Sequence, residues 1–241
     1  MGIISDKDKA QLRKMFADLQ HDIKLLYFTN PEAASHDHGH HHEHEDEHNH
    51  EHGEHCHYCE ATQEILQEVT GLTDGKARLE IYDIKRDAAV AQKYGIDKIP
   101  ATVFLGEDDK DFGIRFFGIP SGYEFATLVE DIVDLSKGSN RLTSAAKAAI
   151  EKVDRDIHIQ VFITPTCPYC PKAARMGHQL AMENEHIRAD VIEAIEFPDL
   201  ANSYGVYGVP KTVINGNVEF EGAVPEKDFV NYVLEANNKA R

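Results

Sequence analysis

The chain has 241 residues, 41% of them hydrophobic and 28% charged, which is typical of a globular protein with a buried core. Its formal net charge of −17 argues against nucleic acid and anionic membranes as partners, because both would repel it. The sequence contains neither a signal-peptide core nor an apolar run long enough to span a bilayer, so we expect a cytoplasmic protein.

Helical and strand patterns alternate along the first half of the chain. Ser5 is the expected N-cap of the first helix, and Gly95 is the expected end of the third. The break at residues 137–140 is the best domain boundary. Apolar periodicity predicts helices over residues 5–20, 61–69, 88–94 and 123–135, and strands over residues 23–28, 77–84, 99–104 and 114–117.

One polar segment of low complexity interrupts this pattern between residues 30 and 55. Such a composition cannot bury a core. Imidazole and carboxylate groups together suit Zn, Ni, Cu or Co ions. The alternative is a tolerated surface insertion, because lengthening a loop costs little extra closure entropy. The candidate metal ligands are His36, His38, His40, His41, His42, His44, His48, His50, His52, His55 and His57.

The second half of the chain repeats the first. The distance from a cysteine to a later proline is 44 residues for Cys56 and Pro100, and 43 for Cys167 and Pro210. A Tyr-Gly dipeptide precedes each proline, and a threonine follows it two residues later. These agreements in register indicate a tandem repeat of one α/β unit. The second unit has predicted helices over residues 144–153, 172–182, 200–204 and 226–236, and strands over residues 157–163, 186–195, 209–214 and 218–221.

The four cysteines form two C-x-x-C pairs, Cys56 with Cys59 and Cys167 with Cys170. Such a pair at a helix start can close a disulfide, but the loop is too short to stabilise the fold much, so the bridge suits a redox switch. Backbone N–H groups at the helix start favour a thiolate on the first cysteine. The alternatives are half of a zinc site and a plain buried pair. His55 and His57 flank Cys56, which leaves a Cys2His2-type metal site open for the first pair.

The order of strand, C-x-x-C, helix and aliphatic-Pro-x-Thr strand resembles the thioredoxin superfamily. The sequence Cys-Pro-Tyr-Cys at residues 167–170 is similar to the glutaredoxin motif. Two such units in one chain resemble the protein disulfide oxidoreductases of thermophilic archaea and bacteria. The resemblance implies the α/β class, with two tandem thioredoxin-like folds, each a central mixed β-sheet flanked by helices. Unit 1 would span residues 1–138, with the His-rich insertion at about 30–55, and unit 2 residues 139–241.

The same resemblance implies a thiol–disulfide oxidoreductase that reduces, forms or isomerises protein disulfides. Exchange would need no cofactor, and the insertion would be the place for Zn or Ni. Partners would be protein disulfides and dithiols, together with a thioredoxin-reductase-like flavoenzyme. The implied catalytic residues are Cys56 and Cys167 as nucleophiles and Cys59 and Cys170 as resolving thiols. Pro100 and Pro210 would be cis and lie beside the disulfides, and the backbones of Ile99 and Val209 would pair with substrate.

One departure from the family pattern concerns acid–base chemistry. Thioredoxins usually carry a buried acid in the strand before the motif, but residues 157–163 contain none. Glu193 and Glu196, on the next strand, are the candidate proton acceptors.

Two further functions fit these residues. One is a Zn- or Ni-binding or delivery protein that uses the His-rich tract with Cys56 and Cys59. The other is a dedicated reductase of a peroxidase partner. Tight metal that blocks alkylation of Cys56 would favour the first, and poor reduction of generic disulfides would favour the second. A combined hypothesis is that zinc capping of Cys56 silences the first unit.

Overall fold

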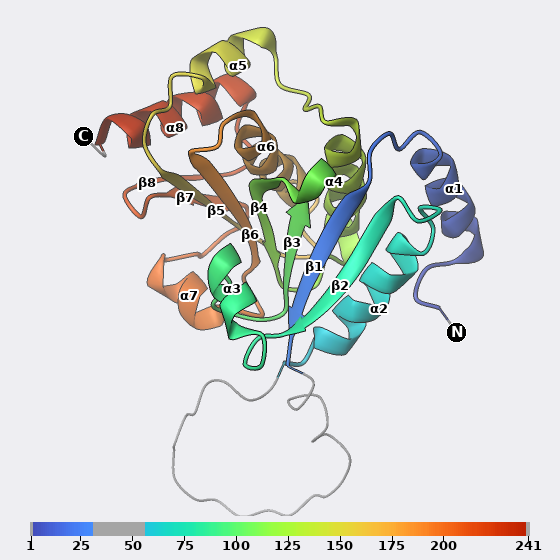
Figure 1. The fold of residues 1–241 in the computed structure, drawn as a ribbon. Coiled ribbons are helices and arrows are strands. Elements are labelled where there is room, and N and C mark those ends of the chain that lie inside the picture. Colours follow the sequence, from blue (N-terminus) through green and yellow to red (C-terminus); the bar gives the residue numbers. More distant parts are fainter. Residues whose placement is uncertain (1, 31–55, 240–241) are drawn as a thin grey trace, which may run out of the picture.

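The computed structural model describes residues 2–30 and 56–239, which form a twisted central sheet with helices on both faces (Figure 1). The strands lie in the order β2-β1-β3-β4-β6-β5-β7-β8. Their bounds are β1 Ile23–Thr29, β2 Ala77–Asp83, β3 Ala101–Leu105, β4 Asp111–Phe117, β5 Ile157–Ile163, β6 Ile187–Glu193, β7 Lys211–Ile214 and β8 Val218–Glu221.

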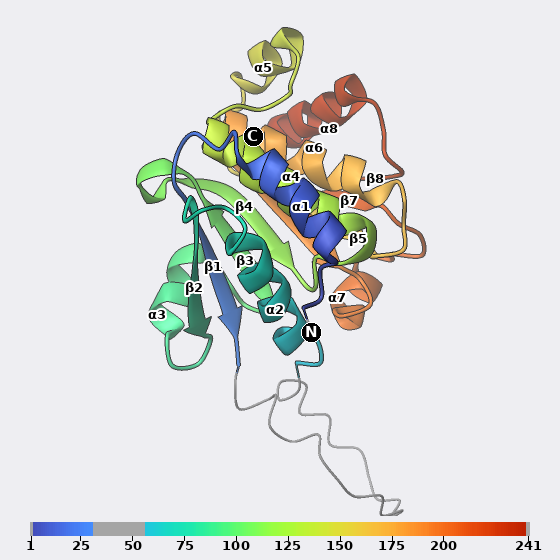
Figure 2. The ribbon, with the colours of Figure 1, turned by 90° about the vertical axis from the view of Figure 1, so that its right-hand side faces the viewer.

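The helices cover the sheet unequally. Residues of α3 and α7 belong to the smaller of two apolar clusters, and the other α-helices contribute to the larger one. Figure 2 shows α3 and α2 on opposite sides of β1 and β2. Within the described residues, no helix is both long and apolar enough to cross a bilayer. The helices are α1 Asp6–Phe16, α2 Cys59–Thr70, α3 Ala88–Tyr94, α4 Phe125–Lys137, α5 Ser144–Ile150, α6 Cys170–Glu183, α7 Pro198–Ser203 and α8 Glu226–Lys239, with short 3-10 turns η2 Glu107–Asp109 and η3 Gly122–Glu124.

Local signals in the sequence account for several of these boundaries. The Ser5 hydroxyl accepts a hydrogen bond from the Asp8 N–H at 3.2 Å, as an N-cap does. Gly95 has a φ of 65° and ends α3, which is a conformation that favours glycine. Along β1, Leu25 and Tyr27 enter the larger cluster, whereas the intervening Leu26 enters the smaller one.

The two halves of the chain share one continuous sheet. The first contributes β2-β1-β3-β4 and the second contributes β6-β5-β7-β8. They meet where β4 and β6 pair in parallel, from Ile114 opposite Ala189 to Phe117 opposite Ile192. The predicted α/β class with two tandem thioredoxin-like folds is confirmed, but we expected a separate sheet for each unit. The join satisfies the backbone N–H and C=O groups that two open sheet edges would otherwise leave unpaired.

The direction of the strands places both cysteine pairs at one end of the sheet. β1 and β4 run the same way, because each is antiparallel to β3. β4 is parallel to β6, and β6 is parallel to β5. Cys56 follows β1 and Cys167 follows β5. Both pairs therefore lie beyond the carboxyl ends of these strands, at the same end of the sheet. The predicted division of the chain after residue 138 stays a prediction, although Gly138, with a φ of 58°, does end α4.

Candidate functional site

The second cysteine pair lies at the start of α6. Cys167 and Cys170 form a disulfide with Cα atoms 5.5 Å apart, and α6 begins at Cys170. Cys170 is fully buried, whereas Cys167 is 8% exposed and Tyr169 between them is 70% exposed. Pro171 is accommodated because the first turn of a helix has no intrahelical use for its N–H. The outer sulfur is therefore the one that a substrate meets first.

A cis-proline loop lies against this disulfide. The Val209–Pro210 peptide bond is cis, and the Cys167 Sγ lies 3.7 Å from the Val209 carbonyl oxygen. Val209 is partly buried and Pro210 is buried. The family resemblance implies that Pro210 lies beside the second disulfide, and the structure brings Cys167, Val209 and Pro210 together. The role of the Val209 backbone in binding substrate stays a prediction.

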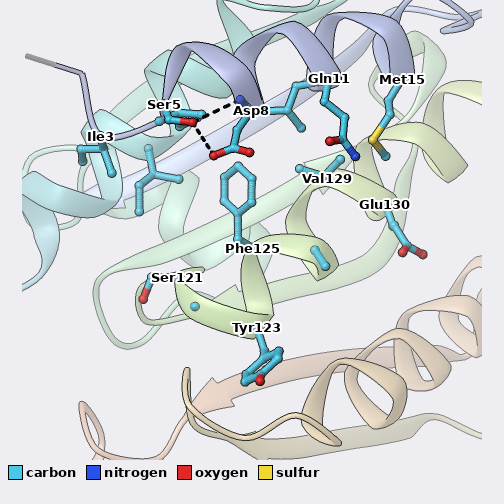
Figure 3. A pocket seen from close by; sticks show the side chains of 15 residues that line it. Ile3, Ser5, Asp8, Gln11, Met15, Ser121, Tyr123, Phe125, Val129 and Glu130 are labelled. Atoms are coloured by element: carbon cyan, nitrogen blue, oxygen red, sulfur yellow. Dashed lines mark hydrogen bonds between the residues drawn. The ribbon is translucent and has the colours of Figure 1, made fainter.

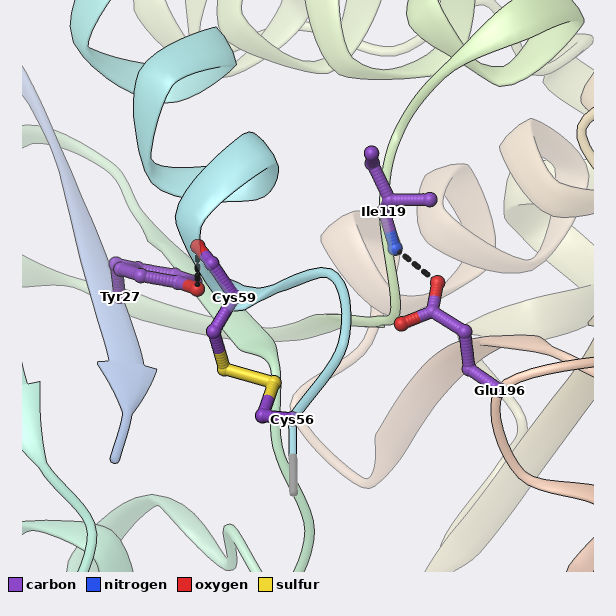
Figure 4. The surroundings of a disulfide bond; sticks show 5 residues. All are labelled: Tyr27, Cys56, Cys59, Ile119 and Glu196. Atoms are coloured by element: carbon purple, nitrogen blue, oxygen red, sulfur yellow. Dashed lines mark hydrogen bonds between the residues drawn. A yellow bond between two sulfur atoms is a disulfide. The ribbon is translucent and has the colours of Figure 1, made fainter. Parts of the chain in front are cut away.

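The first cysteine pair has the same backbone arrangement. Cys56 and Cys59 form a disulfide with the same Cα separation of 5.5 Å, and α2 begins at Cys59. Cys59 is buried, and Cys56 is partly exposed. The Ile99–Pro100 bond is also cis. In Figure 4 the ring of Tyr27 lies beside Cys59, on the side away from Glu196, and its hydroxyl donates a 2.7 Å hydrogen bond to the Cys59 carbonyl oxygen.

Tyr27 and Val161 occupy equivalent places in the two units, because they lie opposite Thr102 and Thr212 in the sheet. Neither residue is an acid, which agrees with the absence of an acid from the strand before the second cysteine pair. Burial raises the pKa of Tyr27 well above its usual value, so this phenol stays protonated as a donor to Cys59.

A buried acid does lie close to the second site, and sequence reasoning missed it. Glu124 ends the turn η3 and is fully buried. Its Oε2 accepts a 2.6 Å hydrogen bond from the Thr127 hydroxyl, whereas Oε1 has no partner among the described residues. Burial raises the pKa of Glu124 to about 7. η3 packs against α6, and the Tyr123 N–H donates to the Pro165 carbonyl just before the motif.

Of the two candidate proton acceptors, Glu193 ends β6 and Glu196 follows it, and their predicted role at the second pair stays a prediction. Glu193 is buried and accepts hydrogen bonds from the N–H groups of Ile195 and Glu196, so it closes the turn after β6. Glu196 lies in the surroundings of the first disulfide, where Figure 4 shows it beside Ile119. The sequence cannot tell which unit Glu196 faces, because β6 lies between β4 of unit 1 and β5 of unit 2.

A buried network of charges joins the two units behind the second pair. From α6, Arg175 forms ion pairs with Asp134 and Glu130 of α4. The His178 Nδ1 lies 2.6 Å from Asp131 Oδ2, and both side chains are almost fully buried. The acids come from the first unit and the two basic side chains from the second, so the network favours this one docking of the halves.

Glu124 should make stability depend on pH. Its folded pKa of about 7 lies above the ordinary value of 4.5, so the folded protein holds a proton that the unfolded chain has lost. We therefore expect Glu124 to lower the free energy of unfolding as pH rises from about 5 to 7, by at most about 1.4 kcal/mol per pH unit for this one group.

Urea unfolding of the wild type and of Glu124→Gln between pH 5 and 8 measures this effect. The substitution should flatten the slope, whereas Glu235→Gln, in an exposed pair with Lys239, should leave it unchanged. An equal slope in the wild type and the Glu124 variant would contradict the assignment.

A hollow of about 550 Å³ lies between α1 and the start of α4, and no cysteine lines it (Figure 3). Phe125 and Met15 contribute to its apolar wall, and Asp8 and Glu130 to its rim. No predicted site residue lines it.

The predicted metal ligands His36 to His55 lie outside the described residues. Of the predicted set, only His57 is described, and it is exposed. Among residues 2–30 and 56–239, no cluster of three or more His, Cys, Asp or Glu side chains could hold a metal. The metal expectation therefore stays untested by the structure.

Comparisons with known proteins agree with this geometry. A family model described as a thioredoxin domain matches residues 157–235. Thioredoxin from Methanocaldococcus jannaschii is 39% identical over 75 residues, which cover 31% of this chain and 88% of that protein. One subunit of the alkyl hydroperoxide reductase of Pseudomonas putida is 23% identical over 171 residues, 68% of this chain and 33% of that protein. This chain thus spans about a third of the length of that relative.

Two solved structures each cover nearly all of the chain. A protein disulfide oxidoreductase from Aeropyrum pernix superposes with a TM-score of 0.82 at 29% identity, over 98% of this chain and 94% of that one. The alkyl hydroperoxide reductase protein AhpF of Enterococcus faecalis gives a TM-score of 0.80 at 25% identity, over 95% and 99%. Fold and site together define a tandem thioredoxin-fold protein with a C-x-x-C disulfide in each half. The chain belongs to the thioredoxin family.

Proposed function

We propose that the protein catalyses thiol–disulfide exchange on protein substrates at both C-x-x-C sites. The observation that carries the proposal is the Cys167 sulfur at a helix start, 3.7 Å from the carbonyl that precedes cis-Pro210. A thiolate there is favoured by the helix N-terminus. The proposed substrate strand pairs with the backbone of Val209 at the second site and of Ile99 at the first.

Reduction of a substrate proceeds in two exchange steps. The Cys167 thiolate attacks a substrate disulfide, a mixed disulfide forms, and one substrate sulfur leaves as thiolate. Cys170, fully buried behind Cys167, then attacks Cys167, so that the substrate is released reduced and the pair becomes a disulfide. Cys56 and Cys59 play the matching roles in the first unit. Oxidation follows the same steps in reverse.

The exposed aromatic side chains around Cys167 support a protein substrate. Tyr169 is 70% exposed, and Tyr207, three residues before Pro210, is 96% exposed. Large exposed rings beside a reactive group are the side chains that protein interfaces use as anchors. The electrons return to the protein, in this proposal, from a thioredoxin-reductase-like flavoenzyme.

A second candidate is a dedicated reductase of a peroxidase partner. It is favoured by the match of most of this chain to part of an alkyl hydroperoxide reductase. The two functions differ in substrate range. A broad oxidoreductase reduces insulin at a rate comparable to its other substrates, whereas a dedicated reductase reduces insulin poorly and one peroxidase rapidly.

The test is a redox titration in which the four cysteines are alkylated and counted by mass spectrometry across a series of dithiothreitol ratios. Both pairs should titrate as two-electron couples, and the reduced protein should reduce insulin or a peroxidase. A pair that is never reduced, or reduced protein without turnover on either substrate, would contradict the proposal.

The same titration with zinc or with chelator tests the His-rich tract, whose proposed metal binding rests on sequence alone. Zinc that protects Cys56 from alkylation in the full chain, but not after deletion of residues 35–54, would make the first unit a metal-controlled site. Equal alkylation in both would leave the tract without influence on the cysteines.

A further inference from the structure

We propose that Glu196, supplied by the second unit, is the acid that takes up and returns a proton as the first cysteine pair cycles between disulfide and dithiol. The proposal rests on thiol–disulfide exchange at Cys56 and Cys59. It assigns to the first site a residue from the other half of the chain.

The fold brings Glu196 to the first site across the join of the sheet. Glu196 follows β6, the strand that pairs with β4 of the first unit. Its Oε1 accepts a 2.6 Å hydrogen bond from the backbone N–H of Ile119, just beyond the end of β4. In Figure 4 its carboxyl group and Ile119 lie on the side of the disulfide opposite Tyr27.

Gly118 leaves the space that this carboxyl group occupies. A Cβ built on Gly118 would lie 2.7 Å from Glu196 Oε1 and 2.5 Å from the Glu193 Cβ. The φ of Gly118 is 104°, so glycine is also the residue that this backbone conformation favours. The matching position in the first half is Arg86, three residues beyond the end of β2, where an exposed arginine pairs with Asp87. The repeat therefore places an acid at this position in only one of its two copies.

The surroundings of Glu196 set its pKa near neutral pH. Burial raises its pKa to about 7, the N–H of Ile119 opposes that shift, and the charge of Glu193 adds to it. On β1, the charge of Glu196 helps to raise the pKa of Tyr27, the side chain that is hydrogen-bonded to Cys59. Lys98, which lies over the Phe117 ring beside this turn, is paired with Asp97. Glu196 is thus electrostatically coupled to the start of α2.

The step that uses this acid balances as follows. In the mixed disulfide, the S–H bond of Cys59 breaks and its proton passes by way of a water molecule to the carboxylate of Glu196. The Cys59 sulfur bonds to the Cys56 sulfur, and the bond from Cys56 to the substrate sulfur breaks. The substrate leaves as a thiolate with the electron pair, so the substrate is reduced and the cysteine pair is oxidised. A group with a pKa near the working pH is suited to exchange a proton in both directions.

The test compares alkylation of reduced Cys56 with that of reduced Cys167 in the same molecules, between pH 5.5 and 9, by mass spectrometry. In the wild type, the rate at Cys56 should show an inflection near pH 7 besides the ionisation of the thiol itself. Glu196→Gln should remove this inflection and raise the rate near pH 7 by roughly threefold, because a negative charge that opposes the thiolate is gone. Glu196→Asp should restore the inflection.

Cys167 is the internal control, and its profile should be the same in all three proteins. An unchanged Cys56 profile in Glu196→Gln, or equal changes at Cys56 and Cys167, would overturn the proposal. If the glutamine variant does not fold, the wild type and a variant with His55→Gln and His57→Gln decide the question together, because imidazoles beside Cys56 also titrate in this range. An inflection that disappears with the histidines overturns the proposal. The equilibrium of Cys56/Cys59 with dithiothreitol should change slope near pH 7, and a constant slope overturns the proposal. These readouts need no turnover, so they remain valid even if the protein does not reduce protein disulfides.

Discussion

The substitution Cys167→Ser should abolish exchange at the second site, by about a thousandfold or more, because a serine hydroxyl does not form the nucleophile that the thiolate provides. Cys170→Ser should have a different effect. Cys167 can still attack, but no thiol is left behind it to resolve the product, so substrate should accumulate as a covalent mixed disulfide. The burial of Cys170 and the 8% exposure of Cys167 fix this order of events.

The measurement is insulin reduction in a chain that also carries Cys56→Ser, which silences the first site. Trapped substrate is counted by mass spectrometry of non-reduced protein. Trapping in Cys167→Ser instead of Cys170→Ser would show that the inner cysteine attacks first. A matched pair, Cys56→Ser and Cys59→Ser in a Cys167→Ser chain, asks the same question of the first site.

Arg175→Leu should destabilise the whole protein by about 3 kcal/mol, because it removes the buried partner of Asp134 and leaves that buried carboxylate only the more exposed Arg141, 3.6 Å away. For a chain of this size that corresponds to a fall in Tm of roughly 6–12 °C. Asp134 already has its pKa raised by burial, which shows that its charge is costly here even with Arg175 present. Since the network joins α4 to α6, we expect the two halves of the wild type to unfold in one transition.

Arg78→Leu is the control, because Arg78 is 69% exposed and pairs with Asp22 at the surface. It should change stability by less than about 1 kcal/mol. Differential scanning calorimetry of the three proteins gives both Tm and the number of transitions. Equal effects of the two substitutions would contradict the role given to the buried network.

The elements and the cysteine sites could be predicted from sequence because their signals are local. β5 and β8 begin and end at the predicted residues, and α3 ends at the predicted Gly95. α6 begins two residues earlier than predicted, at Cys170, because the pattern of apolar residues starts only after Pro171. The spacing of the cysteines predicts the disulfides, whereas the cis-prolines and their proximity to Cys167 are implied by the family resemblance alone.

The acids could not be predicted because burial is a property of the assembled sheet. Glu124 lies in the sequence at the start of a helix, where an exposed glutamate is common. It is buried because η3 turns the chain against α6 of the other unit. The position of Glu196 near the first disulfide could not be predicted for the same reason. No pattern in the sequence of β4 or β6 predicts that these two strands pair. Their pairing determines which residues of the second unit lie close to the first.

The continuous sheet also limits which substrates could bind at both disulfides at the same time. Both disulfides lie at one edge, and β1 and β5, which lead to them, are four strand spacings apart, roughly 19 Å. A small folded domain is about 30 Å across. Two folded substrates of that size need about 30 Å between their centres, so under the proposed function one folded substrate at either disulfide would exclude a second from the other. An extended chain of about six residues bridges the same gap, so one unfolded polypeptide can occupy both sites together.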